Sequence, residues 1–237
     1  MTKKILVTGF PHTGTTILRA KIGECYSVFD QPREFGDPPN YNPNSEYEWY
    51  VWKHPFIHTQ FRNSGFKIKP NTHFSDTIII PIIRNPWYVF TSLKKRGEQT
   101  GDFDISDNSH GHSLAYYFNA AEVILDAFKN NYDGVYPIRY EDMFENNYQK
   151  LKEIFDKIGL KYDSDIFSNK SKIYKHNESQ FIENYSQNGK YDNEYRAWQI
   201  NQKFQNMNNE VDIPNDISEK LANHSAIKEL GYSDPRN

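Results

Sequence analysis

Short apolar runs alternate along this chain with segments whose apolar residues recur every three or four positions. Residues 4–8 (KILVT) and 77–83 (TIIIPII) are almost continuously apolar, which predicts strands buried on both faces, and 135–139 predicts a third. Helical spacing predicts helices over 15–24, 87–96, 112–130, 147–158 and 217–230. Strands that alternate with helices predict an α/β fold in three layers, with a mainly parallel central sheet and helices on both faces.

The intervening segments give weaker signals. Residues 30–45 are rich in Pro, Gly, Asn and Asp and predict a long loop, and 97–111 predicts another. Aromatic residues at mixed spacing favour a helix from about 45 to Lys53, ended by His54-Pro55. Pro81 predicts a bulge or an early end of its strand, and 163–195 is polar without a clear pattern.

Composition narrows the class of protein. The 237 residues fit one domain, 1–237, and 16% aromatic residues offset a hydrophobic content of only 37%. A net charge of -3 gives no overall basic field for nucleic acid or an anionic membrane. Cys25 is the one cysteine, which excludes an intramolecular disulfide and a cysteine-based metal cluster. With neither a signal peptide nor an apolar span in the sequence, we expect a cytoplasmic protein that contacts no membrane.

The segment GFPHTGTT, residues 9–16, follows the first predicted strand and opens a helix. Glycines let consecutive N–H groups converge on one anion, and the helix N-terminus adds its positive dipole end. The two glycines match the Walker A spacing, but Thr15 stands where that pattern has lysine, which argues against nucleoside triphosphate hydrolysis. The segment predicts a phosphate-binding loop, with an ordinary strand–turn–helix as the alternative.

A second candidate loop, 84–92 (RNPWYVFTS), follows the second predicted strand. Ligands of such sheets bind at the carboxyl ends of the strands, so both loops are expected at one edge. Arg84 and Ser92 are spaced so that both can face one phosphate. The alternative is that Arg84 forms a surface salt bridge.

The two loops together resemble sulfotransferases that use 3′-phosphoadenosine 5′-phosphosulfate (PAPS), most closely the tyrosylprotein and carbohydrate branches. Their first loop reads G-x-P-[RK]-S-G-T-T and their second R-[DN]-P-x-x-[VA]-x-x-S, and the resemblance extends from residue 4 to about 232. It implies a P-loop nucleotide-binding fold in which Arg84 and Ser92 hold the 3′-phosphate. It also implies a first loop that binds the 5′ side of the cofactor, formed by Pro11, His12, Thr13, Gly14, Thr15 and Thr16.

His12 stands where the family has Arg or Lys, and the resemblance gives it a catalytic role at the bridging oxygen. Lys53, in a segment similar to K-[TDS]-P, would neutralise charge on the leaving phosphate; a solvated lysine on a helix is the alternative. Tyr140, in IRYEDM, would lie near the nucleotide, or be a core aromatic followed by helix-capping acids. Lys190 and Arg196 are further candidates for the 3′-phosphate.

Sulfuryl transfer to a hydroxyl needs a general base within hydrogen-bond reach. The tyrosylprotein branch has a glutamate at about this place in the chain, which favours Glu34, with His54, His58 and His73 as alternatives. The expected acceptor is a small-molecule or glycan hydroxyl, and aromatic residues between 41 and 52 could stack on a sugar or belong to the core. No metal is expected. The oligomeric state is not encoded in any recognisable motif.

Two other functions fit parts of this pattern. A nucleotide or small-molecule kinase with a degenerate P-loop would bind ATP with magnesium, although the loop lysine is missing. A catalytically inactive nucleotide-binding member of the fold would account for His12 in place of Arg or Lys. Binding of adenosine 3′,5′-bisphosphate, binding of ATP, and transfer of labelled sulfate distinguish the three.

Overall fold

The computed structural model describes residues 2–34, 46–57, 61, 65–100, 112–168, 204–208 and 210–237. Five strands within these ranges form one parallel sheet in the order β2-β3-β1-β4-β5. The strands are β1 (Lys3–Gly9), β2 (Val28–Glu34), β3 (Trp49–His54), β4 (Thr77–Ile83) and β5 (Ile138–Arg139). This confirms the predicted α/β class and puts the ends of β1 and β4, which precede the two candidate loops, side by side.

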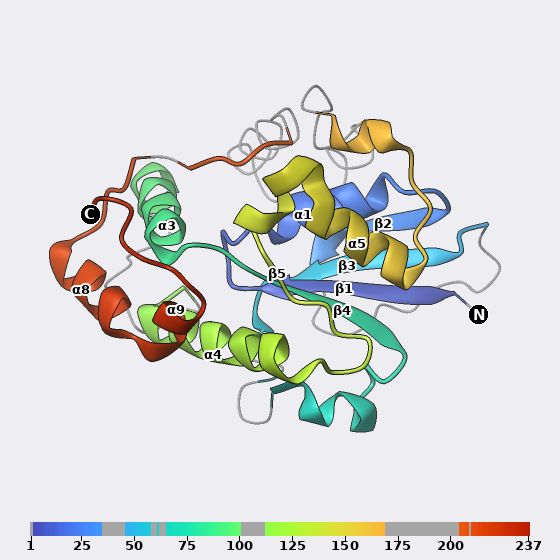
Figure 1. The fold of residues 1–237 in the computed structure, drawn as a ribbon, viewed down its shortest axis with the longest axis horizontal. Coiled ribbons are helices and arrows are strands. Elements are labelled where there is room, and N and C mark those ends of the chain that lie inside the picture. Colours follow the sequence, from blue (N-terminus) through green and yellow to red (C-terminus); the bar gives the residue numbers. More distant parts are fainter. Residues whose placement is uncertain are drawn as a thin grey trace.

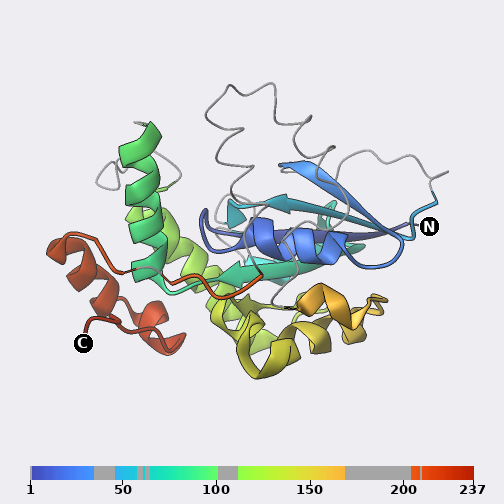
Figure 2. The same cartoon turned by 90° about the horizontal axis from the view of Figure 1, so that it is seen from above.

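Helices cover both faces of the sheet (Figure 1). One face packs against α1 (Thr15–Gly23) and α5 (Gln149–Ile158), and the other against α4 (Leu114–Asn130) and the 3-10 helix η1 (Gly65–Asn71). Three more helices are α3 (Pro86–Thr100), α8 (Asn215–Asn223) and α9 (Ser225–Glu229). Both views place these three beyond the end of the sheet opposite the N-terminus, beside the carboxyl ends of the strands (Figures 1 and 2). Short 3-10 helices are η2 (Glu141–Met143), η3 (Glu145–Tyr148) and η4 (Ser164–Phe167).

Pro81 lies inside β4 without ending it. The backbones of Ile79 and Ile83 form hydrogen bonds on the side of β4 that faces β5. Ile79 N donates to Gly134 O, and Ile83 O accepts from Tyr140 N. The backbone of Pro81, midway between them, faces the same side. On that side, the described part of β4 pairs through a bridge at Ile79 and then through Ile82 and Ile83. The missing N–H therefore falls in a gap of the ladder, as expected for proline in a sheet.

The predictions for the first part of the sheet were wrong in two places. Residues 49–54 form strand β3 between β1 and β2, where a helix was expected. β2 extends to Glu34 inside the predicted loop 30–45, of which 35–45 lie outside the described residues. β2 is an edge strand of the described sheet, and its register with β3 shifts between Asp30 and Glu34, around Pro32.

Most helices agree with their predictions in place and differ at their ends. α5 ends at Gly159 with φ 80°, the left-handed conformation that favours glycine at a helix C-terminus. α3 continues to Thr100, into the predicted loop 97–111. The helix predicted over 217–230 is two helices, because the chain becomes extended at His224 between α8 and α9.

Candidate active site

The first loop is closed by short-range contacts. Thr13 donates from its backbone N–H (3.2 Å) and its hydroxyl (2.7 Å) to the carbonyl oxygen of Phe10. A Cβ atom on Gly9 would lie 2.4 Å from the carbonyl oxygen of Ile82, and one on Gly14 would lie 2.5 Å from the Tyr140 ring. Gly14 also has φ 103°, so glycine is required there for conformation and for space. The loop is thereby held against the N-terminus of α1, where Thr15 and Thr16 begin the helix.

Lys53 reaches this loop from the carboxyl end of β3. Its side chain is buried, with 2% exposed, and Nζ donates to the Thr16 hydroxyl at 2.6 Å. It is therefore not a solvated lysine on a helix, the alternative open from the sequence. The Thr8 hydroxyl donates to the carbonyl oxygen of His54 at 2.7 Å and ties the ends of β1 and β3 together. The first loop thus has one ammonium group beside its helix terminus.

His12 links the two candidate loops. Its Nδ1 lies 2.7 Å from the Ser92 hydroxyl on α3, and its backbone has φ 66°, in the left-handed region. A histidine in that conformation costs more than glycine would. Because β1 and β4 are neighbours in the sheet, the imidazole ring of His12 lies between the phosphate loop and the second loop.

Arg84 directly follows β4 and is buried, with 8% exposed, so it is not a surface salt-bridge residue. The Tyr117 hydroxyl of α4 donates to its carbonyl oxygen at 2.6 Å, and its guanidinium carbon lies 4.3 Å from the centre of the Tyr140 ring. Among the described residues, the buried Nε finds no hydrogen-bond acceptor. A buried cation with an unused donor fits an anionic ligand such as a phosphate.

Tyr140 lies between the two loops. It is buried, and its ring packs against Gly14 on one side and the Arg84 guanidinium on another. The acids that follow do not cap a helix as the alternative proposed. Glu141 accepts hydrogen bonds from Asn85 N (2.9 Å) and the Tyr232 hydroxyl (3.0 Å), and burial raises its pKa.

Asp142 forms an ion pair with Arg139 at 2.7 Å, and both side chains are partly exposed. Tyr140 is therefore a core aromatic residue and also contacts both candidate loops. The sequence left these two interpretations as alternatives, and the structure combines them.

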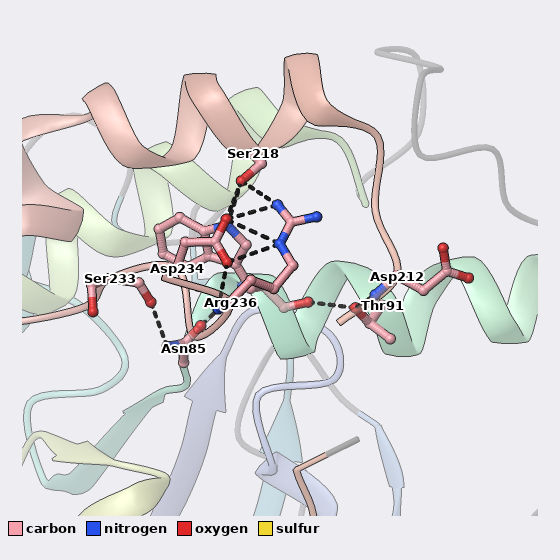
Figure 3. A network of polar contacts seen from close by, with 8 residues as sticks. Asn85, Thr91, Asp212, Ser218, Ser233, Asp234 and Arg236 are labelled. Carbon is pink, nitrogen blue, oxygen red and sulfur yellow. Dashed lines mark hydrogen bonds and ion pairs between the residues drawn. The ribbon is translucent and has the colours of Figure 1, made fainter. Parts of the chain in front are cut away.

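The C-terminal residues hold the second loop in place (Figure 3). Asn85 accepts from Trp87 N at 3.0 Å at the start of α3 and donates from Nδ2 to the carbonyl oxygen of Ser233 at 3.2 Å. The Trp87 indole N–H donates to the Ser218 hydroxyl at 2.7 Å, and that hydroxyl donates to Asp234 at 2.6 Å. Arg236 completes the network with a 2.7 Å contact to Asp234. Sequence patterns gave no sign of these partners, because Ser218 and Ser233 lie 131 and 148 positions from the loop residues that they contact.

A buried ion pair behind the first loop was also missed. Arg19 on α1 lies with Nε 2.8 Å from Asp30 Oδ1 on β2, and the Arg19 side chain is fully buried. Burial raises the pKa of Asp30 to about 6, against the attraction of Arg19, which lowers it. A signal existed in the sequence, since Arg19 and Lys21 alternate with the apolar residues of this helix, and both are buried.

The candidate general bases fall in different places. Glu34 is the last residue of β2 and pairs in register with Lys53 of β3, so its backbone lies at the expected edge of the sheet. His54 follows Lys53 directly, whereas His73 precedes β4 and so lies at the opposite edge. His58, Lys190 and Arg196 lie outside the described residues.

Two further properties concern the described ranges only. No helix there is long and apolar enough to cross a membrane. The same ranges contain no group of three His, Cys, Asp or Glu side chains that could hold a metal ion. Cys25 is buried, and burial raises the pKa of its thiol to about 12.

Comparison with known proteins gives matches at the level of structure. No protein family model matches the chain, and no curated protein matches it by sequence. The sulfotransferase domain from the curacin biosynthetic pathway matches with a TM-score of 0.57 at 15% identity, over 99% of each chain. The chain has the sulfotransferase fold.

A second solved structure with this fold is retinol dehydratase in complex with androsterone and the inactive cofactor PAP. It matches with a TM-score of 0.50 at 14% identity, over 99% of this chain and 82% of the other. At such identities the likeness concerns the sulfotransferase fold alone. Any assignment of activity therefore depends on the residues at the carboxyl edge of the sheet.

Proposed function

We propose that this protein is a sulfotransferase that moves a sulfuryl group from PAPS to a hydroxyl acceptor. The observation that carries the proposal is the junction of the two loops. His12 Nδ1 lies 2.7 Å from the Ser92 hydroxyl, and Tyr140 packs against both Gly14 and the Arg84 guanidinium. Two anion-binding elements in contact suit a nucleotide with phosphates at two positions. The PAP complex of a protein with the same fold supports this choice.

Arg84 and Gly14 support the assignment of this cofactor. A buried guanidinium with an unused Nε suits a phosphate, and a loop with glycine at position 14, at a helix N-terminus, suits a second anion. We assign Arg84, Ser92 and Tyr140 to the 3′-phosphate side. We assign Pro11, His12, Thr13, Gly14, Thr15 and Thr16 to the 5′ side. Lys190 and Arg196 remain proposed contacts of the 3′-phosphate.

When bound, PAPS would supply an activated sulfuryl group, which the acceptor oxygen would take as the bond between the sulfur and the leaving phosphate oxygen breaks. Lys53, buried and in contact with Thr16, places a positive charge where the leaving phosphate oxygen gains negative charge. His12 lies between the loops and can donate to the same region. The acceptor proton passes to a base, for which we propose Glu34 because it pairs with Lys53 across β2 and β3.

Calorimetry with adenosine 3′,5′-bisphosphate tests the cofactor assignment. We expect binding by the wild type and a loss of roughly 100-fold in affinity for Arg84→Met, because a charge-assisted bidentate contact is removed. ATP with magnesium serves as the comparison ligand and should bind more weakly. No binding of the bisphosphate at high micromolar concentration, or tighter binding of ATP, contradicts the proposal.

The base is tested by transfer of labelled sulfate to a panel of glycans, phenols and small alcohols. Glu34→Gln should lower the rate of transfer by about 100- to 10,000-fold while bisphosphate affinity changes little. His54→Gln is the matched variant on the neighbouring strand. A large loss for His54→Gln with normal rates for Glu34→Gln would assign the base to His54 instead.

A further inference from the structure

The segment 204–208, which we call the C-terminal strap, runs along the second loop. The Arg84 guanidinium donates through one terminal nitrogen to the carbonyl oxygen of Met207 and, at 3.4 Å, to Asn208 Oδ1. Tyr140 contacts the same segment, since its hydroxyl donates to Gln205 O at 3.5 Å and accepts from Met207 N at 3.3 Å. The strap thus places neutral oxygen acceptors on the guanidinium that faces the proposed ligand.

Besides its contacts with Arg84 and Tyr140, the strap is held at its two ends. Phe204 is buried, stacks on Tyr148 at 5.5 Å, and its carbonyl oxygen accepts from the Tyr148 hydroxyl at 3.3 Å. Beyond the strap, Asp212 N donates to the Thr91 hydroxyl at 3.0 Å and Ile213 is buried. Between these anchors, the described residues include four exposed polar ones, Gln205, Asn206, Asn208 and Glu210.

A segment with few buried apolar contacts opens at low cost compared with the core. A phosphate is also a better partner for Arg84 than a neutral carbonyl, because charge-assisted hydrogen bonds are roughly twice as strong as neutral ones. The described strap contacts and a phosphate on Arg84 draw on the same guanidinium.

We infer that the C-terminal strap is an autoinhibitory contact, in which Met207 and Asn208 compete with the 3′-phosphate of the cofactor for Arg84. This inference rests on the proposed function. When the anion binds, the strap leaves Arg84 and swings from its anchors at Phe204 and Asp212. The apparent affinity for the cofactor is then the intrinsic affinity reduced by the fraction of molecules with the strap open.

Variants that loosen the strap without touching the ligand loops test this competition. Tyr148→Phe removes the hydrogen bond to Phe204 O and keeps the stacked ring. Asn208→Ala removes an exposed acceptor of Arg84 and leaves the core intact, so it remains informative if Tyr148→Phe folds poorly. Tyr132→Phe is the matched control, because its hydroxyl bonds Asp126 on α4, far along the chain from the strap.

Calorimetry with adenosine 3′,5′-bisphosphate gives the main readout. Since one hydrogen bond of typical net strength shifts an equilibrium roughly fivefold, we expect up to about fivefold tighter binding for Tyr148→Phe and about twofold for Asn208→Ala. Tyr132→Phe should bind as the wild type does. Amide hydrogen exchange of peptides that cover 204–208 should rise when the bisphosphate is added to the wild type.

The outcomes separate the two proposals. Wild-type binding with unchanged or weaker affinity in both strap variants, or with slower exchange at 204–208, overturns the competition and leaves the cofactor assignment in place. Absence of bisphosphate binding in the wild type and in both strap variants overturns both. Binding by the strap variants alone supports both, since only a closed strap would then hide the site.

Discussion

The two candidate loops lie side by side but are held in different ways. The loop at 9–16 is closed within itself, through Thr13 to Phe10 and through the backbone of Gly14. The loop at 84–92 is held from outside, by Tyr117, Glu141, Ser218 and the carbonyl oxygen of Ser233. A loop of the first kind can be recognised from eight consecutive residues, whereas the second depends on the whole C-terminal part of the chain.

The first loop also has contacts with distant residues, His12 with Ser92 and Thr16 with Lys53, and loss of the Lys53 contact should have the largest effect. Lys53→Met removes the positive charge but keeps much of the buried volume. We expect transfer of labelled sulfate to fall by about 100- to 1,000-fold, because a preorganised donor to the developing charge is lost. Lys150→Met, on the surface of α5, is the control and should be near normal. Transfer within threefold of wild type in both variants would remove Lys53 from the proposed mechanism.

Gly14→Ala tests the local closure of the first loop. The new methyl group would meet the Tyr140 ring at 2.5 Å in a backbone with φ 103°. Strain and overpacking together should lower the free energy of unfolding by about 2–4 kcal/mol, measured by urea denaturation. Gly159→Ala is the matched control, because φ is 80° there and no atom lies within 4 Å. A similar loss in both variants would show that the backbone conformation, not the Tyr140 contact, decides the cost.

Ser218→Ala tests the distant closure of the second loop. It removes the acceptor of the Trp87 indole N–H, which is then left buried and unpaired. We expect a loss of about 1–3 kcal/mol in the free energy of unfolding, together with weaker bisphosphate binding. Ser233→Ala is the control, since Asn85 bonds only its backbone carbonyl. If both variants unfold like wild type, the C-terminal network does not stabilise α3.

Asp30 gives the smallest effect and a distinct dependence on pH. Its pKa is raised to about 6 in the folded protein, against an ordinary value of roughly 4. The folded state therefore binds this proton more tightly, so its contribution is present at low pH and is lost as pH rises from about 4 to about 6. As the pH rises through that window, the free energy of unfolding of the wild type should fall by about 1–2 kcal/mol because of Asp30. This fall should be absent in Asp30→Asn. Urea denaturation of the wild type and of Asp30→Asn at a series of pH values measures this profile.

Features held by neighbouring residues could be predicted from the sequence, and features held by distant residues could not. The strands at 4–8 and 77–83 and the loop at 9–16 were predictable, because their signals are local. The prediction of a helix from about 45 to Lys53 was wrong because Trp49, Tyr50, Val51 and Trp52 are all buried, and a continuous apolar run has no period that separates strand from helix.

β2 was not predicted because most of its residues are polar, whereas most of those of β3 are apolar. Its residues from Asp30 onward look like a polar loop, and Asp30 is acceptable in a strand only because Arg19 lies beside it in three dimensions. The contacts of Arg84 with Met207 and Asn208 were equally invisible, because they join residues 123 and 124 positions apart. Pairings of this kind are set by topology and leave no mark in a local pattern.

The break in register around Pro32 has a consequence for how copies of this protein behave in a crowded solution. β2 is one of the two edge strands of the described sheet, a position at which a foreign strand could add itself. A strand that shifts register and contains a residue without an N–H cannot offer an unbroken row of donors and acceptors. The same irregularity that made β2 hard to predict therefore makes this edge of the sheet a poor template for edge-to-edge pairing.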